Sequence, residues 1–395
     1  MKRLALWIAL SLVAVSSTAQ AGGKLSHIKV MTQNQYLGAD LTPIVGATSP
    51  EEFNAAVIAA LQQIAANRTV ERVGKLASLI SNRRPHIAGL QEMYEFTCTD
   101  FGSGVCQLFD GAFNDHLTLT MQALQAQGAN YTVAAQVENL VLPPPGFPFP
   151  GLPVYLDADE TPDMFVGVID RDVILARNDV AASVTSFPCQ RPSLDGCNFD
   201  TVAQAMTLIG PINIERGFVG VDATVNGRSY RIVNTHLEVQ NPSADPLAPG
   251  VQAAQASQLI GTMSMQPPAA GSQLIIVGDI NSSPDDTRFP NPTDGPFFTP
   301  YQQLVNGTDL YGNSISAPYA DIWNLNRGMR RGYTCCQEAD LLNPASSHSE
   351  RIDVIFSLDQ PKFSQSSVLG IFPWQKTPSG LWPSDHATVI GRLFY

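Results

Sequence analysis

The stretch Leu274-Ile275-Ile276-Val277-Gly278-Asp279-Ile280-Asn281 passes from four apolar residues into a polar cluster. The apolar run predicts a buried β-strand, and Asp279 and Asn281 stand at its end. These two residues are two apart, so an extended backbone would point their side chains to the same side. Polar groups aimed from the end of a buried strand are typical of a site held by rigid backbone.

Other polar clusters stand at the ends of apolar strands in the same way. They are Asn34, Gln91-Glu92, Asn234-Thr235-His236-Leu237 and Ser384-Asp385-His386, the last of which opens a strand. Each one alone has an ordinary explanation: a turn cap, a solvated carboxylate or a structural histidine. Five such clusters in this order are hard to explain as turns, so we expect their side chains to meet in one cleft.

Helical patterns separate these strands. Ser49 is typical of an N-cap, Pro50 suits the first turn, and Glu52 predicts a capping box. Three more helical patterns follow at residues 70–80, 117–127 and 251–263. Asn226-Gly227 between two apolar runs predicts a β-hairpin. Because helices and hairpins interleave, we expect mixed rather than purely parallel sheets.

Composition excludes several classes of protein. The chain has 395 residues, of which 44% are hydrophobic, and this is too apolar for a disordered chain. The formal net charge of −12 argues against a sequence-independent DNA coater, which needs a basic surface. We expect one domain over residues 22–395, with loop insertions at about 97–162 and 285–318. The proline-rich stretch Leu142–Pro150 lies in the first insertion, and a domain linker is the alternative interpretation.

Residues 1–21 have the pattern of a signal peptide. Lys2 and Arg3 precede the apolar run Leu4–Val15, and Ala19-Gln20-Ala21 is a small-x-small cleavage site. The run is shorter than the roughly 20 residues that a membrane-spanning helix needs. We therefore expect an exported protein, either secreted or periplasmic.

Six cysteines fit an oxidising compartment, although six reduced thiols are the alternative. Two pairs each bracket a short loop, and we expect the disulfides Cys98–Cys106 and Cys189–Cys197. Cys335 and Cys336 are adjacent, and three states stay open for them: a vicinal bridge, free thiols or pairing elsewhere.

The ordered clusters resemble the endonuclease/exonuclease/phosphatase superfamily, which includes deoxyribonuclease I and bacterial sphingomyelinases. The resemblance runs from about residue 28 to residue 395. Its anchors are Met31-Thr32-Gln33-Asn34, Pro85-His86-Ile87-Ala88-Gly89-Leu90-Gln91-Glu92, Asn234-Thr235-His236-Leu237, Gly278-Asp279-Ile280-Asn281, Arg351-Ile352-Asp353 and Ser384-Asp385-His386. It implies an α/β (α+β) fold, a four-layer α/β/β/α sandwich in which two mixed β-sheets pack face to face between outer helices.

The resemblance also implies a metal site. Glu92 would be the main metal carboxylate, with Asn34 beside it, and Asp385 would belong to the shell around metal and phosphate. Oxygen ligands of this kind suit a divalent metal, with Mg²⁺ first and Mn²⁺ or Ca²⁺ as alternatives. Arg171 is a candidate to reach the phosphate, and Arg177 is equally well placed.

The remaining motif residues would carry the catalytic steps. By resemblance, Asp279 orients or activates the attacking water, and Asn281 donates a hydrogen bond to the phosphate. His236 and His386 would flank the phosphate, one stabilising its charge and the other protonating the leaving oxygen. The resemblance does not say which histidine has which role.

Asp353 follows Arg351-Ile352 where the superfamily has a carboxylate that pairs with the last histidine. It would fix the tautomer of that ring; a buried salt bridge to Arg351 is the alternative. No carboxylate is evident as the partner of His236, although Glu95 and Asp100 stand near the right place in the sequence.

Two substrate classes stay open, a phospholipid and a nucleic acid, with a sphingomyelinase-like phosphodiesterase slightly ahead of an extracellular deoxyribonuclease I-like nuclease. Ser282-Ser283 disfavours an inositol 5-phosphatase, in which an aromatic residue and an arginine follow this motif. Ile371-Phe372-Pro373-Trp374, with Phe147-Pro148-Phe149, could touch a membrane. An inactive binding protein is the least favoured reading, because the polar set is complete. No obligate protein partner is evident.

Overall fold

A computed structural model describes most of the chain. The described residues are 26–144, 146–157, 161–207, 210–240, 248–288, 296–326 and 331–395. The expected signal peptide, residues 1–21, lies outside them. No helix among the described residues has both the length and the apolar character needed to cross a membrane.

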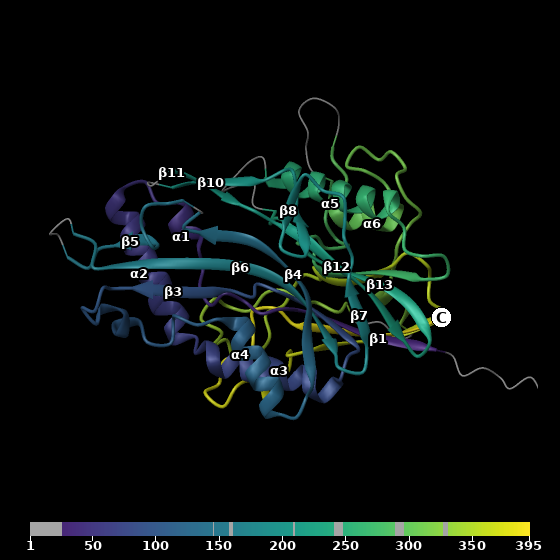
Figure 1. Cartoon of the computed structure of the whole chain (residues 1–395), viewed down its shortest axis with the longest axis horizontal. Helices are drawn as coiled ribbons and strands as arrows, with labels where there is room; N and C mark the ends of the chain where they lie inside the picture. The colour runs from purple at the N-terminus through teal and green to yellow at the C-terminus, as the bar shows by residue number, and fades with distance from the viewer. Residues whose placement is uncertain are drawn as a thin grey trace, which may run out of the picture.

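Two eight-stranded sheets form the centre of the molecule (Figure 1). The first has the order β17-β18-β1-β2-β6-β3, with β4 and β5 also paired to β6. Its strands are β1 (His27–Asn34), β2 (Ile87–Gln91), β3 (Glu95–Thr99), β4 (Tyr131–Leu142), β5 (Leu152–Val154), β6 (Met164–Arg177), β17 (Phe363–Leu369) and β18 (Thr388–Phe394). Only β1 and β2 pair in parallel in this sheet, so it is mixed, as expected.

The second sheet is also mixed. It has the order β15-β16-β14-β13-β12-β9-β8, with β7 paired to β12, and its parallel pair is β13 with β14. Its strands are β7 (Ala181–Val184), β8 (Arg191–Ser193), β9 (Gly196–Asn198), β12 (Gly217–Val225), β13 (Arg228–His236), β14 (Gln273–Asp279), β15 (Ala320–Asp321) and β16 (Asp353–Ser357). Asn226-Gly227 connects β12 to β13 as the predicted hairpin, and a separate two-stranded sheet joins β10 (Ala203–Thr207) to β11 (Gly210–Ile214).

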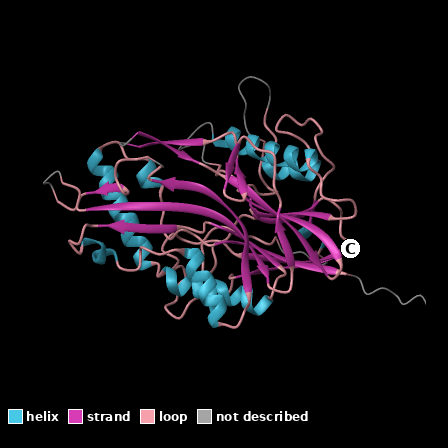
Figure 2. Ribbon diagram, in the orientation of Figure 1, coloured by secondary structure: helices cyan, strands magenta, loops and turns pink. Residues whose placement is uncertain are grey.

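Helices cover the outer face of each sheet (Figure 2). Helices α2 (Pro50–Ala66), α3 (Thr69–Arg83) and α4 (His116–Ala126) pack on the first sheet, and α5 (Ala248–Met265) and α6 (Pro300–Asn306) pack on the second. A short helix α1 (Thr42–Val45) precedes α2. The expected four-layer α/β/β/α sandwich is therefore confirmed.

The start of α2 differs in one detail from the sequence prediction. Ser49 accepts a hydrogen bond from the backbone N–H of Glu52 at 3.2 Å, as an N-cap does. The Glu52 carboxylate accepts chiefly from the backbone and hydroxyl of Thr48, at 2.8 and 2.7 Å, and its contact with the Ser49 backbone is weaker. Thr48 offers two donors where the cap offers one, so the predicted capping box is only weakly closed.

Residues 97–162 contain more regular structure than the insertion loop we expected. They hold most of β3, a 3₁₀ helix (Val105–Phe109), α4, β4 and β5, and three of these elements are strands of the first sheet. The sequence Gln136-Val137-Glu138 in β4 alternates polar and apolar residues, which is the signal of a half-buried strand. The second insertion, 285–318, holds α6, and its residues 289–295 lie outside the described part of the chain.

Each cysteine is paired with another that is close to it in the sequence. Cys98–Cys106 and Cys189–Cys197 form disulfides, each with Cα atoms 6.0 Å apart. Cys335 is joined to its neighbour Cys336, the vicinal bridge among the three states left open.

Apolar side chains fill most of the space between the sheets, and a polar link at Asn234 crosses it. Val30 and Ile174 of the first sheet pack with Ile232 and Ile275 of the second. Nearer the strand ends, Asn234 of β13 lies against the first sheet. Its Oδ1 accepts from Gln91 Nε2 at 2.6 Å, and its Nδ2 donates to the Leu90 carbonyl at 3.0 Å. This link fixes the two sheets relative to each other just below the polar clusters.

Space for this link requires a glycine opposite it. A Cβ at Gly89 would lie 2.6 Å from both Asn234 Oδ1 and Val277 Cγ2. We predict that Gly89→Ala lowers the free energy of unfolding by roughly 1–3 kcal/mol, the usual cost of overpacking. Urea denaturation measures this.

The control is Gly74→Ala within α3, where a Cβ would meet nothing within 4 Å. Alanine is the better helix former, so this variant should gain roughly 0.5–1 kcal/mol. Equal stabilities for the two variants would contradict the prediction.

Candidate active site

Three strands of the second sheet bring three polar side chains into one row. His236 ends β13, Asp279 ends β14 and Asp353 begins β16, and the ladder pairs His236 with Asp279 and Asp279 with Asp353. Neighbouring strands are about 4.8 Å apart, so these residues are direct neighbours. All three are buried, which places the row inside the edge of the sandwich rather than on its surface.

The first sheet contributes the facing groups. Asn34 ends β1 and Glu92 follows β2, its parallel neighbour, so both lie at the same edge. Asn34 Nδ2 donates to Glu92 Oε1 at 3.0 Å and to Asp279 Oδ2 at 3.1 Å, which joins the two sheets. The backbone N–H of Leu37 donates to Glu92 Oε2 at 2.9 Å. Glu92 has a φ of 55°, an unusual conformation for a residue with a Cβ and one that functional sites often contain.

His386 stands between two carboxylates. Its Nδ1 lies 2.8 Å from Asp353 Oδ2 and 3.6 Å from Asp279 Oδ2. Its backbone N–H donates to Ser384 Oγ at 3.0 Å, and that hydroxyl donates to the Asn34 carbonyl at 2.8 Å. Burial alone would lower the pKa of His386, but the charges of Asp353, Asp385 and Asp279 outweigh it and raise the pKa well above 6.5. The ring is therefore held as an imidazolium.

Arg351 is not the partner of Asp353, which was the alternative left open. The Arg351 guanidinium is 2.7 Å from Asp321 Oδ2 in the neighbouring strand β15. Asp353 is thus free to pair with His386.

Asn281 lies beside the row and contacts two of its members, Asp279 and His236. The Asn281 backbone N–H donates to Asp279 Oδ1 at 2.9 Å. The Asn281 side-chain nitrogen donates to the Leu237 carbonyl at 2.9 Å and lies 3.1 Å from His236 Nε2. Burial, partly offset by the charge of His386, raises the pKa of Asp279 to about 6.

The partner of His236 is an arginine. Arg216 Nη1 lies 3.0 Å from His236 Nδ1, and its guanidinium is 3.6 Å from Asp170 and 3.8 Å from Glu238. Burial, and then the charge of Arg216, lower the pKa of His236 well below 6.5, so the ring is neutral. Sequence reasoning did not find Arg216, and the one available signal was a charged residue directly before the hairpin strand β12.

Four other candidates stand apart from the row: Arg171, Arg177, Glu95 and Asp100. Arg171 forms ion pairs with Glu95 and, at 3.5 Å, with Asp115. Its alternative, Arg177, pairs with Asp179 at 2.5 Å. The Asp100 carboxylate accepts from loop N–H groups, including that of Cys106 at 3.1 Å. Among the described residues, no hydrogen bond or ion pair joins any of these four side chains to His236 or Asp279.

The carboxylates fit a divalent cation by their chemistry. Burial, opposed by His386 and reinforced by Glu92, raises the pKa of Asp385 to about 7. Burial thus disfavours the charged form of both Asp385 and Asp279, and a bound cation would offset that cost. Glu92, Asp385 and the amide oxygen of Asn34 are hard donors of the kind that Mg²⁺, Mn²⁺ and Ca²⁺ prefer. Ligand atoms of Asp279, Asp353 and His386 also lie within 4.8 Å of one another, but His386 Nδ1 is already engaged by Asp353.

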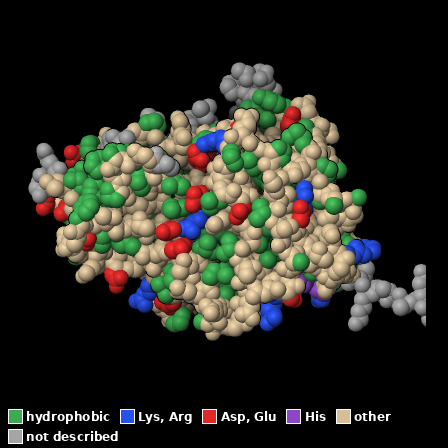
Figure 3. All heavy atoms as spheres, in the orientation of Figure 1, with side chains coloured by type: hydrophobic (Ala, Val, Ile, Leu, Met, Phe, Trp, Pro, Cys, Tyr) green, Lys and Arg blue, Asp and Glu red, His purple; other side chains and the backbone are tan. Residues whose placement is uncertain are grey.

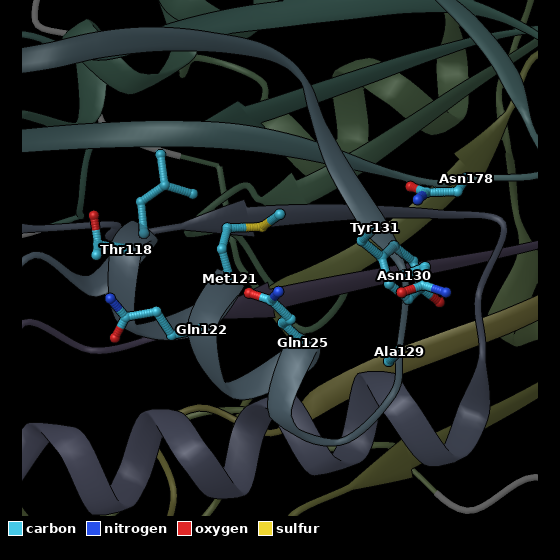
Figure 4. A pocket seen from close by; sticks show the side chains of 9 residues that line it. Thr118, Met121, Gln122, Gln125, Ala129, Asn130, Tyr131 and Asn178 are labelled. Atoms are coloured by element: carbon cyan, nitrogen blue, oxygen red, sulfur yellow. The ribbon is translucent and has the colours of Figure 1, made fainter.

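Two cavities lie outside this row. One, of about 440 Å³, is bordered by α4 and the start of β4 (Figure 4). Its lining holds amides, apolar groups and Tyr131 but no acid, histidine, lysine or arginine, so it lacks the groups for ester chemistry. The other cavity is a groove of about 420 Å³. Asn198 is part of its lining and lies two strands away from His236 in the second sheet. Its lining is largely apolar, and its two charged residues are Glu138 and Glu215.

Comparison with known proteins gives likeness at the level of structure. No protein-family model matches the chain, and no curated sequence matches it either. Truncated TDP2 from Caenorhabditis elegans is 12% identical, with a TM-score of 0.46 over 93% of this chain and 98% of that one. An endonuclease/exonuclease/phosphatase family protein from Leptotrichia buccalis is 14% identical, with a TM-score of 0.48 over 93% of this chain and 100% of that one. A mannosyl-6-phosphatase from Bacteroides thetaiotaomicron is also 14% identical, with a TM-score of 0.47 over 93% and 100%.

Asp172 of β6 is a buried acid near Arg216. Neither of its carboxylate oxygens has a hydrogen-bond partner among the described residues. Burial, and then the charge of Asp170, raise its pKa well above 3.8. A carboxyl with a raised folded-state pKa destabilises the fold above its unfolded pKa, and this cost disappears as the pH falls. We predict that Asp172→Asn raises the melting temperature at pH 8 by roughly 1–3 °C and that the gain vanishes toward pH 4.

Scanning calorimetry across this pH range measures the effect. Asp179→Asn, at a carboxylate that is 66% exposed, is the control and should show no comparable gain. A loss of stability in Asp172→Asn at pH 8 would show that the charge of Asp172 is needed.

Proposed function

We propose that this chain is a metal-dependent phosphoesterase of the endonuclease/exonuclease/phosphatase superfamily and that it hydrolyses a phosphodiester. The observation that carries the proposal is the meeting of Asn34, Glu92, Asp279, Asp353 and His386 at one strand edge. It supplies a base, an acid and a set of metal donors within one buried cluster. An inactive binding protein would not need this set, and it would be stabilised by losing the buried acids.

Glu92, Asn34 and Asp385 would hold the cation. When bound, a divalent ion polarises a phosphoryl oxygen and offsets the negative charge of the ester. Asp279 then orients the attacking water and takes its proton, and Asn281 can donate a hydrogen bond to a phosphate oxygen. The new bond forms between the water oxygen and phosphorus on the side away from the leaving group.

His386 has the properties of the proton donor. Its pKa is raised and its Nδ1 is held by Asp353, so Nε2 is left to protonate the leaving oxygen as the ester bond breaks. Asp353 positions the ring and stabilises its charge. The balance is simple: the water gives a hydroxyl to phosphorus and a proton to Asp279, and the leaving group departs with the proton of His386.

A small or lipid-type diester is favoured over a nucleic acid. On the face shown in Figure 3, lysine and arginine are scattered singly among acids rather than joined in a basic band. The groove two strands from His236 has no lysine or arginine in its lining, and its Glu215 is already paired with Arg191, so the groove offers no basic contact to a second phosphate of a nucleic-acid strand. Trp374 is 74% exposed and stacks on Phe372 with ring centroids 4.5 Å apart, which suits contact with a lipid surface. An extracellular nuclease is the second candidate, kept because the catalytic row itself does not select the ester.

Export is part of the proposal. Residues 1–21 have a signal-peptide pattern, and paired cysteines are typical of proteins that fold in an oxidising compartment. Mg²⁺ is the proposed ion, with Mn²⁺ and Ca²⁺ as alternatives.

The reaction class can be tested with a soluble diester. Hydrolysis of bis(p-nitrophenyl) phosphate should stop with chelator and return with Mg²⁺, Mn²⁺ or Ca²⁺. His386→Ala should lower kcat by roughly 10²–10⁴-fold, the usual loss when an acid–base group is removed. His27→Ala, at the other end of β1 from Asn34, is the control and should leave kcat unchanged. Full activity in chelator, or a His386→Ala enzyme as fast as the parent, would refute the proposal.

The second prediction tests the substrate surface. Trp374→Ala should reduce binding to sphingomyelin vesicles and hydrolysis of vesicle substrate by about tenfold, because an exposed indole at a membrane loses its apolar contact. It should leave hydrolysis of the soluble diester unchanged. Tyr311→Ala removes another exposed aromatic residue, 57% exposed near α6, and serves as the control. If the parent ignores vesicles and degrades plasmid DNA with metal, the nuclease candidate is correct.

A further inference from the structure

We propose that Arg216 is a positioning residue that fixes His236 as the neutral Nε2–H tautomer, so that His236 donates a hydrogen bond to a phosphate oxygen and does not protonate the leaving group. The proposal rests on the proposed function and goes beyond it, because it gives the two histidines different roles. It also gives His236 an arginine partner, where the sequence had identified no carboxylate for this role.

The first step is the direction of the hydrogen bond at Nδ1. Arg216 Nη1 lies 3.0 Å from His236 Nδ1, and a guanidinium has donors but no acceptor. The contact is favourable only if Nδ1 carries a lone pair. A neutral ring with a lone pair on Nδ1 must hold its proton on Nε2.

Arg216 stays charged, so it can only donate to His236. Although burial alone would lower the pKa of Arg216, the charges of Glu238 and Asp170 outweigh it and raise the pKa above the ordinary value. The side chain is only 11% exposed and is held at 3.6 Å from Asp170 and 3.8 Å from Glu238. It therefore presents a fixed positive donor to the ring, and a cation so close also opposes a second proton on it.

The third step concerns the other ring nitrogen. Asn281 Nδ2 lies 3.1 Å from His236 Nε2 and gives one of its two hydrogens to the Leu237 carbonyl at 2.9 Å, so a donor faces this ring nitrogen as well. A hydrogen bond from a charged guanidinium is stronger than one from a neutral amide, so the lone pair is favoured on Nδ1, toward Arg216. The nearest carboxylate oxygen, Asp279 Oδ2, is 3.6 Å from Nε2, beyond a good hydrogen bond. Among the described residues the Nε2–H thus lacks a close acceptor. A phosphate oxygen would supply one.

The two histidines thus differ in their partners. The pair of His386 with Asp353 favours a charged ring that can release a proton. The pair of His236 with Arg216 favours an uncharged ring that keeps its proton and donates a hydrogen bond. Removing a donor of this second kind typically costs about 10²–10³-fold in rate, without any proton transfer being lost.

Nitrogen-15 NMR of histidine-labelled protein tests the tautomer directly and needs no substrate. His236 is assigned from the signals missing in His236→Gln. We expect an unprotonated Nδ1 and a protonated Nε2 in the parent and in Arg216→Lys, since an ammonium is also only a donor. In Arg216→Gln the amide can present its oxygen, so the Nδ1–H tautomer should appear. A parent ring with Nδ1–H would overturn the proposal.

The matched control is Arg231→Gln, at another buried arginine of the same sheet. Arg231 is bound by Asp222 through two 2.8 Å contacts, so its loss has a similar structural cost far from the row. It should leave the His236 signals unchanged. If Arg231→Gln shifts them as much as Arg216→Gln does, the effect is structural and the proposal fails.

Aryl phosphodiesters with leaving groups of different pKa test the role in the reaction. His236→Gln keeps an amide N–H near the position of Nε2, so it should lose about tenfold in kcat, equally for good and poor leaving groups. His386→Ala should lose most with poor leaving groups. A His236→Gln loss that grows with leaving-group pKa would overturn the assigned role. If the parent cleaves no diester, the proposed function fails, and the NMR result still decides the tautomer.

Discussion

The side-chain amide of Asn34 is the contact on which the site depends. It gives one hydrogen to Glu92 of the first sheet and one to Asp279 of the second, so two carboxylates that would repel each other share a donor. The sheets are held in this register a few residues deeper by Asn234, which bonds to Gln91 and to the backbone of β2. Face-to-face sheet packing is otherwise non-directional. These two asparagines give it a defined alignment at the edge where chemistry takes place.

Buried charge is the main cost of this arrangement. The pKa values of Asp279, Asp385 and Asp170 are all raised, mainly by burial, to about 6, 7 and 7. Such groups destabilise the folded protein at neutral pH, and the apolar packing between the sheets has to offset them. Arg216 and the proposed cation would reduce this cost from opposite sides of the row. Functional sites commonly reduce stability in this way.

Much of the fold and of the site could be predicted because both depend on local patterns. Apolar runs that end in polar clusters identified the strands, and the position of Asp353 next to β14 follows from those strands pairing. Arg216 could not be found in this way, since its partners come from β6 and β13 and are distant in the sequence. Residues 97–162 were underestimated as loop because glycine and proline at the strand ends masked the alternation within β4. The role of Arg171 remains a prediction; in the structure it is held by Glu95 and Asp115.

The pairing of β1 with β18 brings together site residues from opposite ends of the described chain. Asn34 belongs to one of the first strands of the described chain, whereas Asp385 and His386 immediately precede the last. A chain in which β18 has not yet paired with β1 therefore lacks the proposed proton donor in its place. Contacts between such distant segments form late and slowly in folding. A partly folded chain would thus lack the proposed activity, which would appear only once β18 has joined β1.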